Sequence, residues 1–134
     1  MNDKNKKLNV AVEWTKSKEV LEEAKTLLDK RLASGAISRT YYAAFHATTA
    51  LLLTEGLEVR SHQALGRLFS LHFIKTGKLD VKFSRILSKA QKYREEADYS
   101  SEFVFTMSDA EERFQEVSEL ITTIEVILKE KKYI

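Results

Sequence analysis

The segment from Ser38 to Leu53 constrains the fold of this chain more than any other part of the sequence. Read as a helix, it carries apolar or aromatic residues on nearly every side. A helix that is apolar all round is a buried helix. The other segments of the chain show one apolar face each, so we expect this segment to form the central helix of a bundle.

Three side chains with polar groups interrupt this apolar segment at regular spacing. Arg39, Tyr42 and His46 are three and four residues apart, which places them on one face of the helix. Burying such groups is costly unless they find partners, so their position is a first indication of a functional surface. Each residue also has a purely structural interpretation. His46 can be a core histidine bonded to backbone or tyrosine groups, and Arg39 can be a solvated residue at the helix start.

The composition excludes several classes of function. The chain has 134 residues, no cysteine and a net charge of +2, which by itself does not indicate a nucleic-acid-binding protein. Without cysteine, disulfides and thiolate catalysis are excluded. The histidines and acidic residues lack metal-ligand spacing and there is no Gly-rich phosphate loop, so we expect no metal and no cofactor. The apolar runs are too short to cross a bilayer, which predicts a soluble, cytoplasmic protein without a membrane partner.

The sequence predicts a single all-α domain over residues 1–134, an up-and-down bundle of four long helices plus a fifth, shorter element. The polar residues 1–8 are expected to be disordered. Apolar spacing predicts helices over residues 10–34, 36–55, 62–76 and 81–97, and a last helix that begins near residue 108.

Glycine and capping signals predict where these helices end and begin. Gly35, Gly56 and Gly77 are expected to stop the first three helices by taking left-handed backbone conformations. Ser108 and Glu111 have the spacing of a capping box for the last helix.

Residues 98–107 break the helical pattern but are rich in apolar side chains. Tyr99, Phe103, Val104, Phe105 and Met107 must be buried against something. Packing on the chain's own bundle is the prediction, and a partner subunit is the alternative.

A charged pair marks the end of the predicted fourth helix. Arg94 and Asp98 are four residues apart, so their side chains can meet on one face, and Tyr99 follows directly. One interpretation is an ordinary intrahelical ion pair. The other is that Asp98 directs the Arg94 guanidinium at a phosphate, with Tyr99 as a hydroxyl donor or stacking surface.

Taken together, these residues resemble a known family, the HEPN domain (higher eukaryotes and prokaryotes nucleotide-binding), in its small stand-alone prokaryotic branch. The resemblance covers about residues 10–130. It is carried by Ser-Arg-Thr-Tyr-Tyr-Ala-Ala-Phe-His-Ala from residue 38, Ala50 to Leu52, Gly56, Ser61-His62, Phe73 to Gly77, and Arg-Glu-Glu-Ala-Asp-Tyr from residue 94.

The resemblance implies a helical bundle that usually forms a homodimer and is often encoded beside a minimal nucleotidyltransferase, as a toxin–antitoxin pair. Many HEPN proteins are metal-independent ribonucleases whose motif, an arginine and a histidine separated by four to six residues, lies at the dimer interface. On this resemblance, Arg94, Asp98 and Tyr99 are the candidate catalytic residues. Arg39, Tyr42 and His46 are the candidate residues for binding RNA or a nucleotide.

The sequence departs from the family motif at one point. No histidine follows Arg94, and Asp98 and Tyr99 stand in its place. Arg39 and His46 have the motif spacing but lie earlier in the chain than the motif, and we treat that match as coincidental. Metal-free RNA cleavage needs a group that exchanges protons near neutral pH, which histidine does without a large pKa shift, whereas aspartate is a weak base and tyrosine a weak acid.

Three functional hypotheses therefore stay open. The first is a toxin-like, RNA-directed homodimer in which Arg94 holds the scissile phosphate, with His46 reaching the same groove. The second is a non-catalytic helical module that binds a nucleotide or serves a partner nucleotidyltransferase. The third is a plain interaction protein in which the Arg94–Asp98 pair only holds the bundle together.

Overall fold

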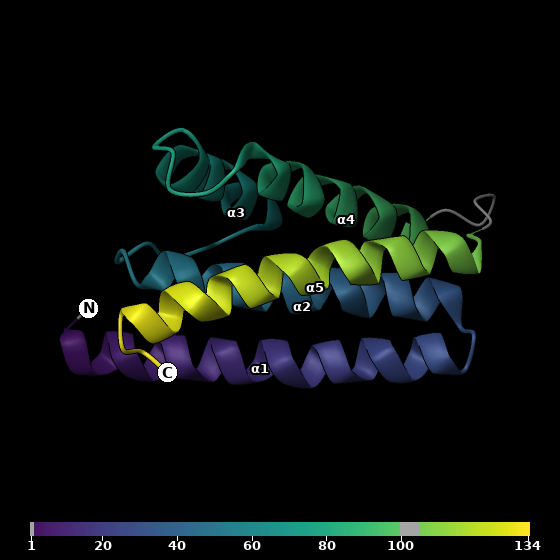
Figure 1. Ribbon diagram of the computed structural model, residues 1–134, viewed down its shortest axis with the longest axis horizontal. Helices are drawn as coiled ribbons and strands as arrows, with labels where there is room; N and C mark the ends of the chain where they lie inside the picture. Colours follow the sequence, from purple (N-terminus) through teal and green to yellow (C-terminus); the bar gives the residue numbers. More distant parts are fainter. Residues whose placement is uncertain (1, 100–104) are drawn as a thin grey trace.

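The computed structural model describes residues 2–99 and 105–134, and every regular element in these ranges is a helix (Figure 1). Four long helices and one shorter element confirm the predicted fold class. None of the helices in the described ranges is both long and apolar enough to cross a membrane. The elements are α1 (Asp3–Asp29), α2 (Ala33–Leu53), α3 (His62–Phe69), a π-helical turn η1 (Ser70–Ile74), α4 (Val81–Tyr99) and α5 (Met107–Glu130).

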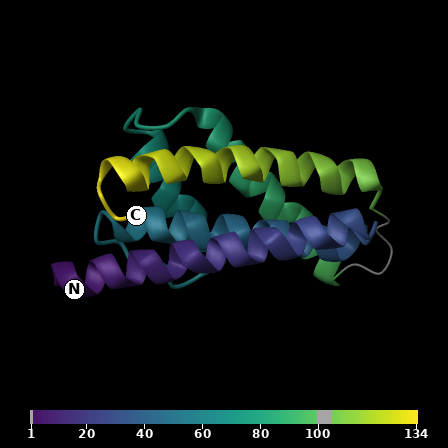
Figure 2. The ribbon, with the colours of Figure 1, turned by 60° about the horizontal axis from the view of Figure 1, so that its bottom comes forward.

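Helix α2 is the centre of the bundle, as its apolar pattern predicts. It packs against α1, α4 and α5, and buried residues occur along its length from Ala36 to Leu53. The long helices alternate in direction, and both ends of the chain lie at the same end of the bundle (Figures 1 and 2). Small residues let α1 come close to α2, so that the buried Ser17 hydroxyl donates to the carbonyl of Ala43 at 2.8 Å.

Helix α1 begins seven residues earlier than its apolar spacing predicts. The Asn2 side chain accepts a hydrogen bond from the N–H of Asn5 at 2.8 Å and caps a helix that starts at Asp3. The helix therefore includes most of the segment that we expected to be disordered, because a capping signal outweighs a locally polar composition.

Two of the three predicted glycine stops are present. Gly56 and Gly77 have φ angles of 75° and 77°, but Gly35 lies inside α2. The left-handed residue after α1 is instead Arg31, with φ of 61°. A Cβ added at Gly35 would make an ordinary van der Waals contact with Cδ1 of Leu27, at 3.4 Å.

The capping box of α5 lies two residues before the predicted one. Thr106 accepts from the N–H of Asp109 at 3.1 Å, and the Asp109 carboxylate accepts from the N–H of Thr106 at 3.0 Å. The prediction of Ser108 and Glu111 was wrong, because two overlapping signals occur here and the earlier one satisfies both backbone donors.

The segment between α4 and α5 is described only in part. Tyr99 is the last residue of α4 and is 79% exposed. Phe105 packs on the ring of Tyr93, with a centroid distance of 5.9 Å, so for this residue packing on the chain's own bundle is confirmed. Phe103 and Val104, which we expected to be buried, lie outside the described residues.

Candidate functional site

The Arg94 side chain reaches inward from the last turns of α4 and is only 7% exposed. Its guanidinium carbon lies 5.3 Å from the ring centroid of Tyr41, 5.7 Å from that of Tyr42 and 5.9 Å from that of Tyr99. Two of these rings come from the central helix and one from α4 itself. A guanidinium held over aromatic faces is fixed in orientation and stays charged at low exposure.

Asp98 provides the acidic partner of this guanidinium. Nη1 of Arg94 donates to Oδ2 of Asp98 at 3.3 Å, and the Asp98 side chain is 30% exposed. Burial alone lowers the pKa of Arg94, but Tyr42, Asp98 and Tyr99 outweigh it and raise the pKa above its usual value. The predicted pair therefore exists, with Arg94 buried and Asp98 partly exposed.

One donor of Arg94 is unused. Its Nε has no hydrogen-bond partner among the residues that the structure describes. An unpaired buried donor costs about 1–3 kcal/mol. An acceptor that reaches this guanidinium, such as a phosphate oxygen, would recover that free energy.

A second polar contact lies beside Arg94, between Tyr41 and His62. Tyr41 is fully buried, and its hydroxyl oxygen is 2.7 Å from Nδ1 of His62. Burial raises the pKa of Tyr41 far above its usual value, so the phenol is neutral. His62 is the first residue of α3, a helix that Ser61 caps by accepting from the N–H of Ala64 at 3.0 Å.

His62 lies among aromatic rings and near a positive charge. Its ring centroid is 4.9 Å from that of Phe45 and 5.5 Å from that of Tyr41. Burial and the charge of Arg94 lower the pKa of His62, and Glu95 opposes them. The imidazole is therefore neutral at pH 7 and able to accept a proton.

The contact between Tyr41 and His62 was not predicted from the sequence. The three histidines looked scattered, because nothing in the spacing brings residue 62 to residue 41. One signal was available: a tyrosine on an all-apolar helix needs a partner for its hydroxyl when it is buried.

The structure separates the three polar residues predicted on the central helix. Tyr42 joins Arg94, whereas Arg39 and His46 face α1. Nη1 of Arg39 lies 3.7 Å from a carboxylate oxygen of Glu23, and Nδ1 of His46 lies 2.7 Å from one of Glu13. His46 still lies next to one ring of the aromatic cluster, which consists of Tyr41, Tyr42, Phe45 and His62.

The link between His46 and that cluster is Phe45, whose ring centroid lies 5.6 Å from that of His46. Arg39 is about half exposed and has no such link in the described contacts. Of the six predicted site residues, Arg94, Asp98, Tyr99 and Tyr42 lie together. His46 contacts Glu13 and Phe45, and Arg39 lies apart.

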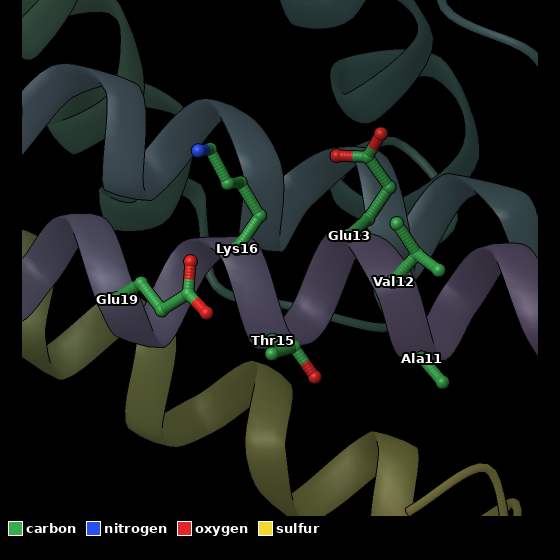
Figure 3. A pocket seen from close by; sticks show the side chains of 6 residues that line it. All are labelled: Ala11, Val12, Glu13, Thr15, Lys16 and Glu19. Carbon is green, nitrogen blue, oxygen red and sulfur yellow. The ribbon is translucent and has the colours of Figure 1, made fainter.

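Two shallow hollows lie along α1. Each is lined by a glutamate that pairs with a residue of α2: Glu13 with His46, and Glu23 with Arg39. One has a volume of about 410 Å³ and is lined by Glu13, the partner of His46, with Ala11, Val12, Thr15, Lys16 and Glu19 (Figure 3). Another, of about 400 Å³, includes Arg39. Arg94 and Asp98 line neither of these two hollows. Their pair lies outside them, with the Arg94 guanidinium next to three tyrosine rings.

The described residues contain no group of three or more histidine, aspartate or glutamate side chains placed to hold a metal ion. The groups that this site offers are a fixed guanidinium, a carboxylate, a neutral imidazole and the exposed ring of Tyr99.

Comparison with known proteins found one matching domain family and several similar sequences. The HEPN domain model matches residues 11–130. A Methanocaldococcus jannaschii protein named "Putative toxin MJ0605" is 34% identical over 114 residues, which are 85% of this chain and 84% of that protein. A UPF0332 protein of Thermotoga maritima is 28% identical over 133 residues, 98% of each chain. A second M. jannaschii protein, "Putative toxin MJ0142", is 33% identical over 96 residues, 72% of this chain and 65% of that protein.

Proposed function

We propose, from the premise that this chain belongs to the HEPN domain family, that it is a toxin-like protein that cleaves RNA without a metal ion. The toxin names of two M. jannaschii relatives support the toxin-like role. The observation that carries the RNA-directed role is the Arg94 guanidinium, fixed by three tyrosine rings and Asp98, with its Nε free of any described partner.

Each group of the cluster has a role in this proposal. Arg94 holds the scissile phosphate and stabilises the negative charge that develops on its oxygens during cleavage. Asp98 keeps the guanidinium in position through their hydrogen bond. The exposed ring of Tyr99 offers a stacking surface for a base of single-stranded RNA.

The proposal includes a homodimer and a nucleotidyltransferase partner. A two-fold axis near the end of α4 would bring two Arg94 groups to one composite site and double its positive charge. The large exposed ring of Tyr99 beside Arg94 supports an interface there. A neighbouring reading frame with the Gly-Ser and Asp-x-Asp signature of a nucleotidyltransferase would support the antitoxin partner.

A second candidate function is a non-catalytic module that serves the nucleotidyltransferase. The observation that favours it is the low exposure of Arg94, whose whole residue is 6% exposed. A phosphate reaches such a group only if the side chains around it move or a partner remodels the surface. In that case Arg94→Ala would weaken binding of the partner or its nucleotide, and no RNA would be cleaved.

Incubation of structured RNA with the purified protein in EDTA tests the first candidate. The proposal predicts cleavage by the wild type and a loss of about 100-fold or more in Arg94→Ala, the size expected when one preorganised donor is removed. Arg85→Ala is the matched control, because Arg85 is an exposed arginine on the same helix, and it should cleave at the wild-type rate. Intact RNA with the wild type, or equal cleavage by Arg94→Ala, would end the ribonuclease proposal.

A further inference from the structure

The contact between His62 and Tyr41 has no role in the function proposed so far. We infer that His62 is the proton acceptor in the RNA cleavage, held in position by the Tyr41 hydroxyl beside Arg94. This inference rests on the proposed ribonuclease function and assigns one further catalytic residue to it.

The first argument is the shared surroundings of His62 and Arg94. The ring centroid of His62 lies 5.5 Å from that of Tyr41 and 6.2 Å from that of Tyr42. The Arg94 guanidinium carbon lies 5.3 Å and 5.7 Å from the same two rings. The imidazole and the guanidinium therefore belong to one cluster, and a phosphate bound at Arg94 brings the adjoining ribose towards His62.

The second argument is the orientation of the imidazole. The contact of 2.7 Å between the Tyr41 oxygen and Nδ1 of His62 is compatible with either tautomer; in the tautomer that we assign, Nδ1–H donates to the Tyr41 oxygen and the lone pair of Nε2 is available to a substrate. The phenol that accepts this bond is fully buried in the core and so fixes the ring in place. Tyr41 is thus a positioning residue, and Nε2 of His62 is the reacting atom.

The cleavage step that follows is balanced without any further reactant. Nε2 of His62 takes the proton of a ribose 2′-hydroxyl, and the 2′-oxygen forms a bond to the phosphorus held by Arg94. The bond from phosphorus to the 5′-oxygen breaks, and the leaving oxygen takes a proton from water. The resulting hydroxide removes the proton from the imidazolium, which leaves a 2′,3′-cyclic phosphate, a 5′-hydroxyl and neutral His62.

The imidazole comes to the Arg94 cluster from a different helix. The chain has no histidine after Arg94 in α4. The first residue of α3 brings an imidazole to the same cluster from another part of the sequence. The packing of α3 on α2 then brings the proton-transfer group, His62, to the site.

The charged and titratable groups around His62 set the expected pH dependence. Tyr41 and Tyr42 face it from α2, and Arg94 and Glu95 act on it from α4. Since the imidazole must be neutral to accept a proton and its pKa is lowered, cleavage should be level near pH 7 and should slow at a pH below the ordinary histidine pKa of about 6.5.

The test compares cleavage in EDTA with binding of an all-2′-deoxy oligonucleotide, which lacks the reacting hydroxyl. His62→Gln should lower the cleavage rate about 100-fold or more, lose the acidic limb of the pH profile, and keep oligonucleotide binding. Added imidazole should restore part of the rate of His62→Ala. His72→Gln is the matched control, a partly buried histidine in η1, and should change neither quantity.

The outcomes separate this inference from the function on which it rests. If the wild type leaves RNA intact, the proposed function fails and the role of His62 fails with it. If cleavage depends on Arg94 but His62→Gln retains the wild-type rate, or if imidazole restores nothing to His62→Ala, the inference alone is overturned. Circular dichroism confirms that each variant is folded, and His62→Asn replaces His62→Gln if the latter is not.

Discussion

At the scale of single residues, the account depends on how Arg94 is buried. The sequence predicts its pairing with Asp98 from their spacing alone, and the structure contains that pair. It does not predict the burial of Arg94 or the contact of Tyr41 with His62. Both depend on how α2, α3 and α4 pack, and no local pattern encodes that packing.

Replacing Asp98 separates a structural role of the pair from a functional one. Asp98→Ala removes the acidic hydrogen-bond partner of a guanidinium that is 7% exposed. We expect a loss of about 1–2 kcal/mol in the free energy of unfolding, measured with urea. Asp29→Ala, which breaks the exposed Lys25–Asp29 pair of the same spacing, is the control and should cost less.

The RNA readout of the same variant decides between the hypotheses. If Asp98 positions Arg94 for phosphate, the cleavage rate falls together with stability. A marked loss of stability with unchanged cleavage and oligonucleotide binding would make the pair a structural one.

The stability of the protein should depend on pH through His62. Its pKa is lower in the folded chain than in the unfolded chain, because of burial and the charge of Arg94. The unfolded chain therefore binds more protons below about pH 6.5, and stability falls as the pH falls through the folded pKa. Urea unfolding between about pH 5 and pH 8 should show this loss, and His62→Gln should show less of it. An identical pH dependence in both proteins would contradict the partly buried position of the imidazole beside Arg94.

At the scale of helices, local signals predict most elements and misplace several of their ends. The glycines at 56 and 77 act as predicted. The stop after α1 falls on Arg31 instead of Gly35, which lies inside α2. On α5 the buried side chains include Arg113, which lies over the ring of Tyr93 and pairs with Glu116. An apolar pattern cannot indicate a buried charge of this kind.

The start of α5 offers a direct test of the observed capping box. Thr106→Ala removes the acceptor for the N–H of Asp109 and should lower the free energy of unfolding by about 1 kcal/mol. Ser108→Ala lies in the first turn, where no capping bond depends on it, and should change stability much less. A larger loss of unfolding free energy in Ser108→Ala than in Thr106→Ala would favour the capping box that we first predicted from the sequence.

At the scale of the whole molecule, the fold class follows from one segment. A helix that is apolar on all sides requires neighbours on all sides, and α1, α4 and α5 supply them around α2 (Figure 2). The position of the candidate site follows less directly. It forms where the central helix meets α3 and α4, and sequence spacing brings only its α4 residues together.

The proposed homodimer is a prediction about the end of α4. Sedimentation at micromolar concentration should show a dimer, and Tyr99→Glu should weaken it, because a charge would replace an exposed aromatic ring in the interface. Val126→Glu, on an exposed apolar residue of α5, is the control. A wild-type protein that sediments only as a monomer would count against a composite site with two Arg94 groups.

The most direct test of the central claim is the single-turnover rate of RNA cleavage in EDTA for the wild type and for Arg94→Lys. Lysine keeps the positive charge but lacks the planar fork that stacks on tyrosine and donates to two phosphate oxygens. If Arg94 holds the scissile phosphate, the wild type cleaves and Arg94→Lys is slower by about 10-fold or more. Equal rates in the two proteins, or no cleavage by either, would contradict the account.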